Sequence, residues 1–204
     1  MKKEVVVASI VVIALMISML TGCTNYRLDV NSDDSRINEH DAALVEQWFT
    51  EQVAEEILTL NANKDVFAIL SGDKNPCAEQ YIGVKLSLIR KTNDHYTIEK
   101  EVEGDYITPV GFTVSGCQYG DMAVLFGTVG DSIYDFKNDQ RQPVNITEVK
   151  IHLDNGDIVS NTLSKLGAFV IFFPADAIAI ELEFVGDSEA FKYSDFYDIA
   201  SLGF

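Results

Sequence analysis

Oxygen-bearing side chains that could bind a divalent cation gather in one stretch, GDSIYDFKNDQ, which spans residues 130–140. Asp131, Asp135 and Asp139 recur every four residues, and Asn138 adds an amide oxygen. Carboxylate and amide oxygens are the ligands that calcium prefers, although the spacing does not match the EF-hand loop. Calcium is therefore the one cofactor that the sequence suggests, and a solvated loop is the alternative.

The sequence carries no recognisable catalytic motif. His40, His95 and His152 have no partner at the spacing of a metal site or a catalytic triad. No nucleophile elbow, HExxH motif, P-loop or dinucleotide-binding fingerprint occurs in the chain. We therefore expect a protein that is not an enzyme, while a hydrolase built on two carboxylates stays open as an alternative.

The N-terminus has the layout of a secretory signal. Lys2 and Lys3 precede an apolar run over residues 5–20, and small residues follow it. Sixteen residues of helix rise about 24 Å, which is less than the hydrocarbon core of a bilayer at about 30 Å. The run is therefore too short for a good permanent membrane span.

The four residues that end this signal, LTGC at positions 20–23, resemble the lipobox of bacterial lipoproteins. The resemblance covers only the first 23 residues. It implies that residues 1–22 are a lipoprotein signal peptide and that Cys23 becomes a diacylated N-terminus. Two acyl chains give stable anchoring, so the resemblance implies a protein held on the extracytoplasmic face of the cell membrane. An ordinary signal peptide or an uncleaved anchor is the alternative.

Two cysteines remain beyond the signal, Cys77 and Cys117. An exported chain meets an environment in which a disulfide can persist. A disulfide that closes the loop of about forty residues between them would stabilise the fold by about 2–4 kcal/mol. We expect the two cysteines to be joined, with two unpaired thiols as the alternative.

The charge of the chain limits its partners. Fifteen Lys and Arg face 32 Asp and Glu, so the formal net charge is −17. Nucleic acid requires a positive footprint, and an anionic leaflet repels an acidic surface. This balance argues against nucleic acid and against a protein that lies flat on a membrane.

The remainder divides into a tether, a helix and a β-rich domain. Residues 23–37 are polar and predict a flexible tether of about 20 Å. Residues 38–62 repeat apolar side chains every three to four positions, which predicts one amphipathic helix. We expect its apolar stripe to pack on the following domain. The alternative is a helix that offers Trp48 and Phe49 to a partner protein.

Residues 64–204 contain short runs with period-two alternation, which is typical of half-buried antiparallel strands. Asn155-Gly156 between two such runs predicts a tight hairpin. In two of these runs, the apolar residues are expected to lie on one buried face of a strand. The aromatic rings near the C-terminus are expected to pack in the core, and the alternative is an exposed set of rings that binds a glycan or a protein. The predicted faces and rings are Val149, Ile151 and Leu153; Ile178, Ile180, Leu182 and Phe184; and Phe191, Tyr193, Phe196 and Tyr197. We expect an immunoglobulin-like β-sandwich preceded by one amphipathic α-helix, with a barrel as the alternative.

These observations predict a non-catalytic binding or display module of the cell envelope, anchored in the membrane through Cys23. Its partner would be an envelope protein or a glycan. One alternative is an accessory or immunity-type subunit of a membrane complex, with the helix around Trp48 as the contact. The other is an envelope hydrolase.

Overall fold

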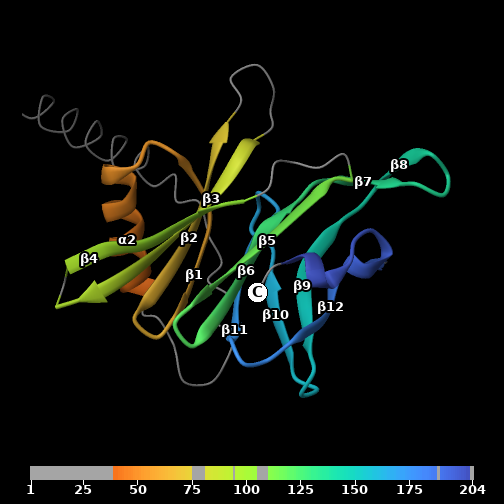
Figure 1. Cartoon of the computed structure of the whole chain (residues 1–204). Coiled ribbons are helices and arrows are strands. Elements are labelled where there is room, and N and C mark those ends of the chain that lie inside the picture. The colour runs from red at the N-terminus through yellow and green to blue at the C-terminus, as the bar shows by residue number, and fades with distance from the viewer. Residues whose placement is uncertain (1–38, 75–80, 94, 105–109, 188, 203–204) are drawn as a thin grey trace, which may run out of the picture.

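A computed structural model describes residues 39–74, 81–93, 95–104, 110–187 and 189–202 (Figure 1). One α-helix, α2 (Glu39–Gln52), precedes thirteen strands and two 3-10 helices in this part of the chain. They are β1 (Glu56–Asn63), β2 (Val66–Lys74), β3 (Tyr81–Thr92), β4 (His95–Glu103), β5 (Phe112–Tyr119), β6 (Met122–Val129), β7 (Ser132–Asp135), β8 (Gln140–Pro143), β9 (Ile146–Leu153), β10 (Ile158–Thr162), β11 (Ala168–Pro174), β12 (Ala179–Gly186), β13 (Ala190–Lys192), η1 (Tyr193–Asp195) and η2 (Ile199–Leu202). No helix in these residues is long and apolar enough to cross a membrane.

The strands form three larger sheets and one hairpin, all antiparallel. We name them the meander sheet (β1-β2-β3-β4), the central sheet (β11-β6-β5) and the outer sheet (β10-β9-β12-β13); β7 and β8 pair only with each other. The prediction of a mainly β fold with a preceding helix is confirmed. The immunoglobulin-like sandwich is not confirmed, because the first sheet keeps its strands in chain order whereas that fold uses Greek-key connections.

The central sheet lies between the meander sheet and the outer sheet (Figure 1), and both of its faces contribute buried residues. Alternate residues of a strand point to opposite faces. In β11, Phe169 and Ile171 pack against the outer sheet, whereas Ala168 and Val170 pack against the meander sheet. This double burial explains why β6 and β11 read as continuous apolar runs, MAVLFGTV and AFVIFFP, rather than as alternating patterns.

Helix α2 covers the other face of the meander sheet. Its Val45 and Phe49 are fully buried against strand residues such as Phe67 and Ile69. The predicted packing of the helix on the domain is therefore confirmed.

The predicted length of this helix, residues 38–62, is wrong. The helix ends at Gln52, and Glu56–Asn63 forms strand β1. Thr59 and Asn61 have low helix propensity, and both are buried where β1 pairs with β2. Six consecutive residues of β1 are buried, so the helical repeat of its apolar side chains was coincidental.

The outer sheet contains one confirmed and one partly wrong expectation. Asn155-Gly156 lies between the paired strands β9 and β10, and Gly156 has a φ of 88°. The predicted core residues of β9 are all buried, and so are Leu182 and Phe184 of β12. Ile178 and Ile180, however, are 64% and 56% exposed. The register of β12 against β9 shifts between Ala179 and Glu181, which marks a β-bulge. Because the bulge adds one residue to β12, the apolar residues before it lie on the face opposite to those after it.

Aromatic rings of the C-terminal segment close the core between the central and outer sheets, as predicted. Tyr193 is buried, and Phe191 and Phe196 pack beside it. Phe112 of β5 lies 5.0–6.0 Å from the rings that surround it, in tilted or edge-on arrangements. Tyr197 remains 36% exposed at the margin of this cluster.

Candidate functional site

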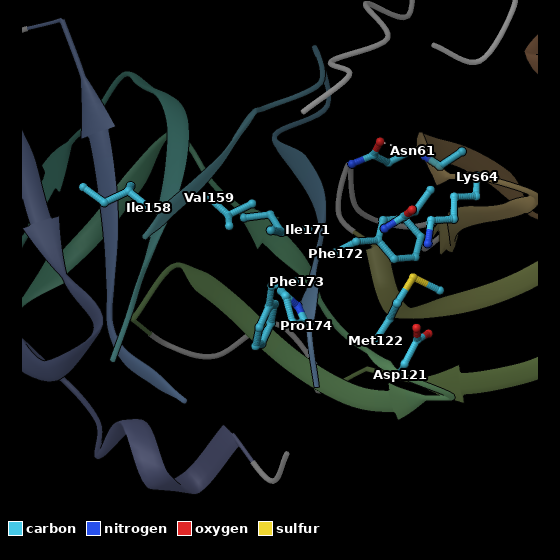
Figure 2. Close-up of a pocket in the computed structure, with 12 residues that line it drawn as sticks. Asn61, Lys64, Asp121, Met122, Ile158, Val159, Ile171, Phe172, Phe173 and Pro174 are labelled. Carbon is cyan, nitrogen blue, oxygen red and sulfur yellow. Dashed lines mark hydrogen bonds between the residues drawn. The ribbon is translucent and has the colours of Figure 1, made fainter. Parts of the chain in front are cut away.

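A groove of about 600 Å³ follows the free edge of strand β11 (Figure 2). Edge strands of the three sheets meet here: β1, β10 and β11 each lie at the edge of their sheet, and β11 contacts both β1 and β10. The groove is lined by residues 61–64, 121–122, 158–159 and 171–174. Four segments that are distant in the sequence therefore build one site.

The floor of the groove is the main chain of β11. This strand pairs with β6 along one edge only. On the other edge, the carbonyl of Val170 accepts a hydrogen bond from the side chain of Asn61. Main-chain groups of alternate residues point to the same edge of an antiparallel strand, so the N–H and C=O of Phe172 also point away from β6. Neither group has a hydrogen-bond partner among the described residues.

Asn61 links two sheets at the inner end of the groove. Its side chain is buried, its Nδ2 donates to the Val170 carbonyl over 2.7 Å, and its Oδ1 accepts from the N–H of Ala62. An asparagine inside a strand is unfavourable. Here its amide donates to a carbonyl on the edge of the neighbouring sheet.

The two walls of the groove differ in chemistry. Figure 2 shows Ile158 and Val159 of β10 on one side, and Lys64 and Met122 on the other. The first wall is apolar, and Ile158 is 58% exposed. The second wall mixes the apolar side chain of Met122 with the exposed charges of Lys64 and Asp121 and with the amide of Asn63. The site can therefore hold apolar groups against one wall and polar groups against the other.

The second wall is shaped by turns with left-handed backbone. Lys64 follows β1 with a φ of 54°, and Gly120 precedes Asp121 with a φ of 62°. Positive φ costs a non-glycine residue about 1 kcal/mol or more. The turn at Lys64 places one positive and the turn at Asp121 one negative side chain on the rim.

The predicted calcium ligands are not assembled into a metal site. Within the described ranges, no three His, Cys, Asp or Glu side chains are placed to hold a metal ion. Asp135 instead accepts hydrogen bonds from Asn138 and Gln142, and Tyr134 donates to Asp139. The bond from the Asn138 amide is the main reason why the pKa of Asp135 lies below its usual value. The carboxylates of Asp135 and Asp139 thus bond within the β7–β8 hairpin. Asp131 contributes its main-chain carbonyl, which accepts from the N–H of Val144.

Trp48 and Phe49 do not form an exposed pair. Phe49 is fully buried. Trp48 is half-buried, and its ring lies 5.6 Å from the ring of Tyr96. The helix therefore uses both aromatic residues to pack on the meander sheet.

Two of the three predicted cysteine sites lie outside the described residues. The lipidation of Cys23 and the pairing of Cys77 therefore stay predictions. Cys117 is present as a buried thiol between the meander and central sheets. Burial raises the pKa of this thiol.

A cluster of polar side chains on the meander sheet gave no signal in the sequence. Ser71, fully buried in β2, donates a 2.5 Å hydrogen bond to Glu55, and Lys85 lies 2.8 Å from the same carboxylate. The hydrogen bond from Lys85 to Glu55 raises the lysine pKa. Lys85 is thus held as an ammonium, whereas a lysine that serves as a general base needs a lowered pKa.

The three histidines lie on different elements and far from one another in the sequence. His40 and His95 are exposed at the ends of α2 and β4, whereas His152 lies 3.3 Å from Glu183 on the outer sheet. The two side chains are within hydrogen-bond distance across the paired strands β9 and β12. The sequence did not indicate this pair, because the two residues are 31 positions apart.

The groove itself was not predicted. The only local signal was a polar residue, Asn61, inside a run of apolar ones. No known family model, curated protein or solved structure matches the chain.

Proposed function

We propose that this protein is a lipid-anchored binding module on the extracytoplasmic face of the cell membrane, held by Cys23 and without catalytic activity. The groove beside β11 is its binding site. The observation that carries the proposal is the free edge of β11 at the floor of this groove, where the main chain of Phe172 is left without a partner among the described residues.

The composition of the groove supports binding. Sites for ligands are mostly apolar cavities of about 300–1,000 Å³ with a few polar groups that fix orientation. This groove falls within that range, with apolar residues such as Ile158 and Phe172 and polar groups at Asn63, Lys64 and Asp121.

The anchor is supported by the sequence. The motif LTGC follows an apolar run, and residues 23–37 are polar enough for a tether of about 20 Å. A lipid at Cys23 would then hold the domain close to the membrane, where its partners would be envelope proteins.

Photo-crosslinking in intact cells tests the site. A photoreactive amino acid replaces Lys64 at the rim of the groove, or Thr97 on an exposed position of β4 as the matched control. We expect a defined partner to be captured from position 64 and not from position 97. Capture from Leu44 of α2 alone would contradict the proposal and favour an accessory subunit that uses its helix.

Membrane fractionation tests the anchor. Cys23→Ala should release the protein from the membrane or leave the precursor uncleaved, and it should abolish lipid labelling. Unchanged lipid labelling of the variant would contradict the proposal.

A further inference from the structure

We propose that the groove binds an extended peptide segment of a partner protein, which pairs with β11 as an added strand. The segment has apolar and polar side chains at alternating positions. This inference rests on the proposed function, because it specifies what the binding module holds in its groove.

The main chain of β11 is the first argument. The N–H and C=O of Phe172 lie on the free edge of β11, point away from β6 and have no hydrogen-bond partner among the described residues. Buried main-chain groups are almost always paired, so a ligand that covers Phe172 must supply partners for both groups. A neighbouring strand supplies a donor and an acceptor at the required spacing, which is the basis of peptide recognition by strand addition.

The ends of this free edge limit the length of the added strand. At one end, the Asn61 side chain already occupies the carbonyl of Val170. At the other end, Pro174 has no N–H, and its carbonyl accepts from the N–H of Ala177 over 3.2 Å. The pairing is therefore short and centred on Phe172.

The walls determine the side chains of the peptide. Successive residues of an added strand point to opposite faces. One face of the peptide would meet Ile158 and Val159, and the other would meet the rim that carries Asn63, Lys64 and Asp121. Apolar residues fit the first face and polar residues the second, so the peptide alternates.

An acyl chain is the competing occupant of such a groove. It would cover the apolar wall formed by Ile158 and Val159. It has no hydrogen-bonding groups along its length, however, so it would cover the main chain of Phe172 without supplying a partner, which is unfavourable for a buried polar group. A peptide can place apolar side chains against Ile158 and Val159 and also pair with the main chain of Phe172.

The test uses purified full-length protein in detergent and a library of synthetic peptides about seven residues long. Library members alternate apolar and polar residues, and scrambled versions with the same composition are the controls. We expect selected peptides to bind, to shift the amide signal of Phe172 in ¹⁵N-phenylalanine spectra and to slow its hydrogen exchange. Phe172→Leu assigns that signal by removing it.

Two matched variants test the site of binding. Ile158→Asp places a charge on the apolar wall, and Ile178→Asp places one at a similarly exposed position that does not line the groove. We expect Ile158→Asp to weaken binding by about tenfold and Ile178→Asp to leave it unchanged. Because both residues are more than half exposed, both variants should fold.

N-methylation of the peptide backbone tests strand pairing directly. Methylating the central amide should weaken binding by about tenfold, since it removes one main-chain hydrogen bond and blocks close approach. Equal binding of methylated and unmethylated peptides, equal binding of scrambled and selected peptides, failure of every library member, or binding of a fatty acid in the groove without any peptide binding would overturn the inference. Capture from position 64 in cells would still stand in those cases, so the proposed function and this inference fail separately.

Discussion

The side-chain amide of Asn61 donates a 2.7 Å hydrogen bond to the main-chain carbonyl of Val170, which lies 109 residues later in the chain. This bond joins the edges of the meander and central sheets. Asn61→Ala should lower the free energy of unfolding by about 1–3 kcal/mol, because it leaves a buried carbonyl without a donor. Urea denaturation measures the change. Asn63→Ala, two residues along the same strand, is the control and should change stability by less than about 0.5 kcal/mol.

Phe49 should contribute to stability rather than to partner binding. Its ring is fully buried between α2 and the meander sheet. Phe49→Ala should lower the free energy of unfolding by about 3–5 kcal/mol. Leu44→Ala on the exposed side of the helix should have little effect. A Phe49→Ala variant with unchanged thermal stability would show that the helix does not pack as described.

Glu46 should give a pH-dependent effect on stability. Burial raises the pKa of this carboxyl above its ordinary value of 4.5. The folded state then binds the proton more tightly than the unfolded state, so stability falls as pH rises through the raised pKa. Glu46→Gln removes that loss and should stabilise the protein at pH 7, by no more than about 0.5 kcal/mol for a half-exposed side chain.

Melting temperatures of the Glu46→Gln variant at pH 7 and below pH 4 check this expectation. The gain should disappear at the lower pH, where Glu46 is protonated in both states. Glu51→Gln, at an exposed position of the same helix, is the control. An equal gain at both pH values would refute the desolvation argument.

The thiol of Cys117 should react slowly in the native protein. It is buried, and its raised pKa keeps it protonated at neutral pH. In the presence of reductant, maleimide labelling followed by mass spectrometry should modify Cys117 only after unfolding. The same spectra without reductant test the predicted disulfide, since a Cys77–Cys117 bond would prevent labelling of either cysteine even in the unfolded chain.

Local patterns identified much of the β structure. The β9–β10 hairpin was predictable because Asn-Gly specifies its turn and the alternation of β9 specifies its face. The strand β1 was not predictable as a strand, because its apolar residues also fit a helical repeat when the neighbouring sheets are unknown. The bulge beside Ile180 was hidden for a related reason: one extra residue reverses the alternation without leaving a signature in the sequence.

The groove could not be predicted, for a different reason. Its four lining segments meet only through the packing of three sheets, and the contact between Asn61 and Val170 joins residues far apart in the chain. The acidic stretch shows the opposite error. Asp135 and Asp139 are close in sequence and suggest a ligand set, but their oxygens accept hydrogen bonds within their own hairpin.

The position of the central sheet has a consequence for the order in which the chain folds. The meander sheet pairs neighbouring strands in chain order, so its strands can associate as soon as residues up to 103 are available. The central sheet needs β11, which follows β6 by nearly forty residues in the chain. Non-local pairing of this kind is slow. If the chain is exported with its N-terminus first, as the signal sequence predicts, one apolar face of the meander sheet is covered only in part, by β5 and β6, until β11 joins them.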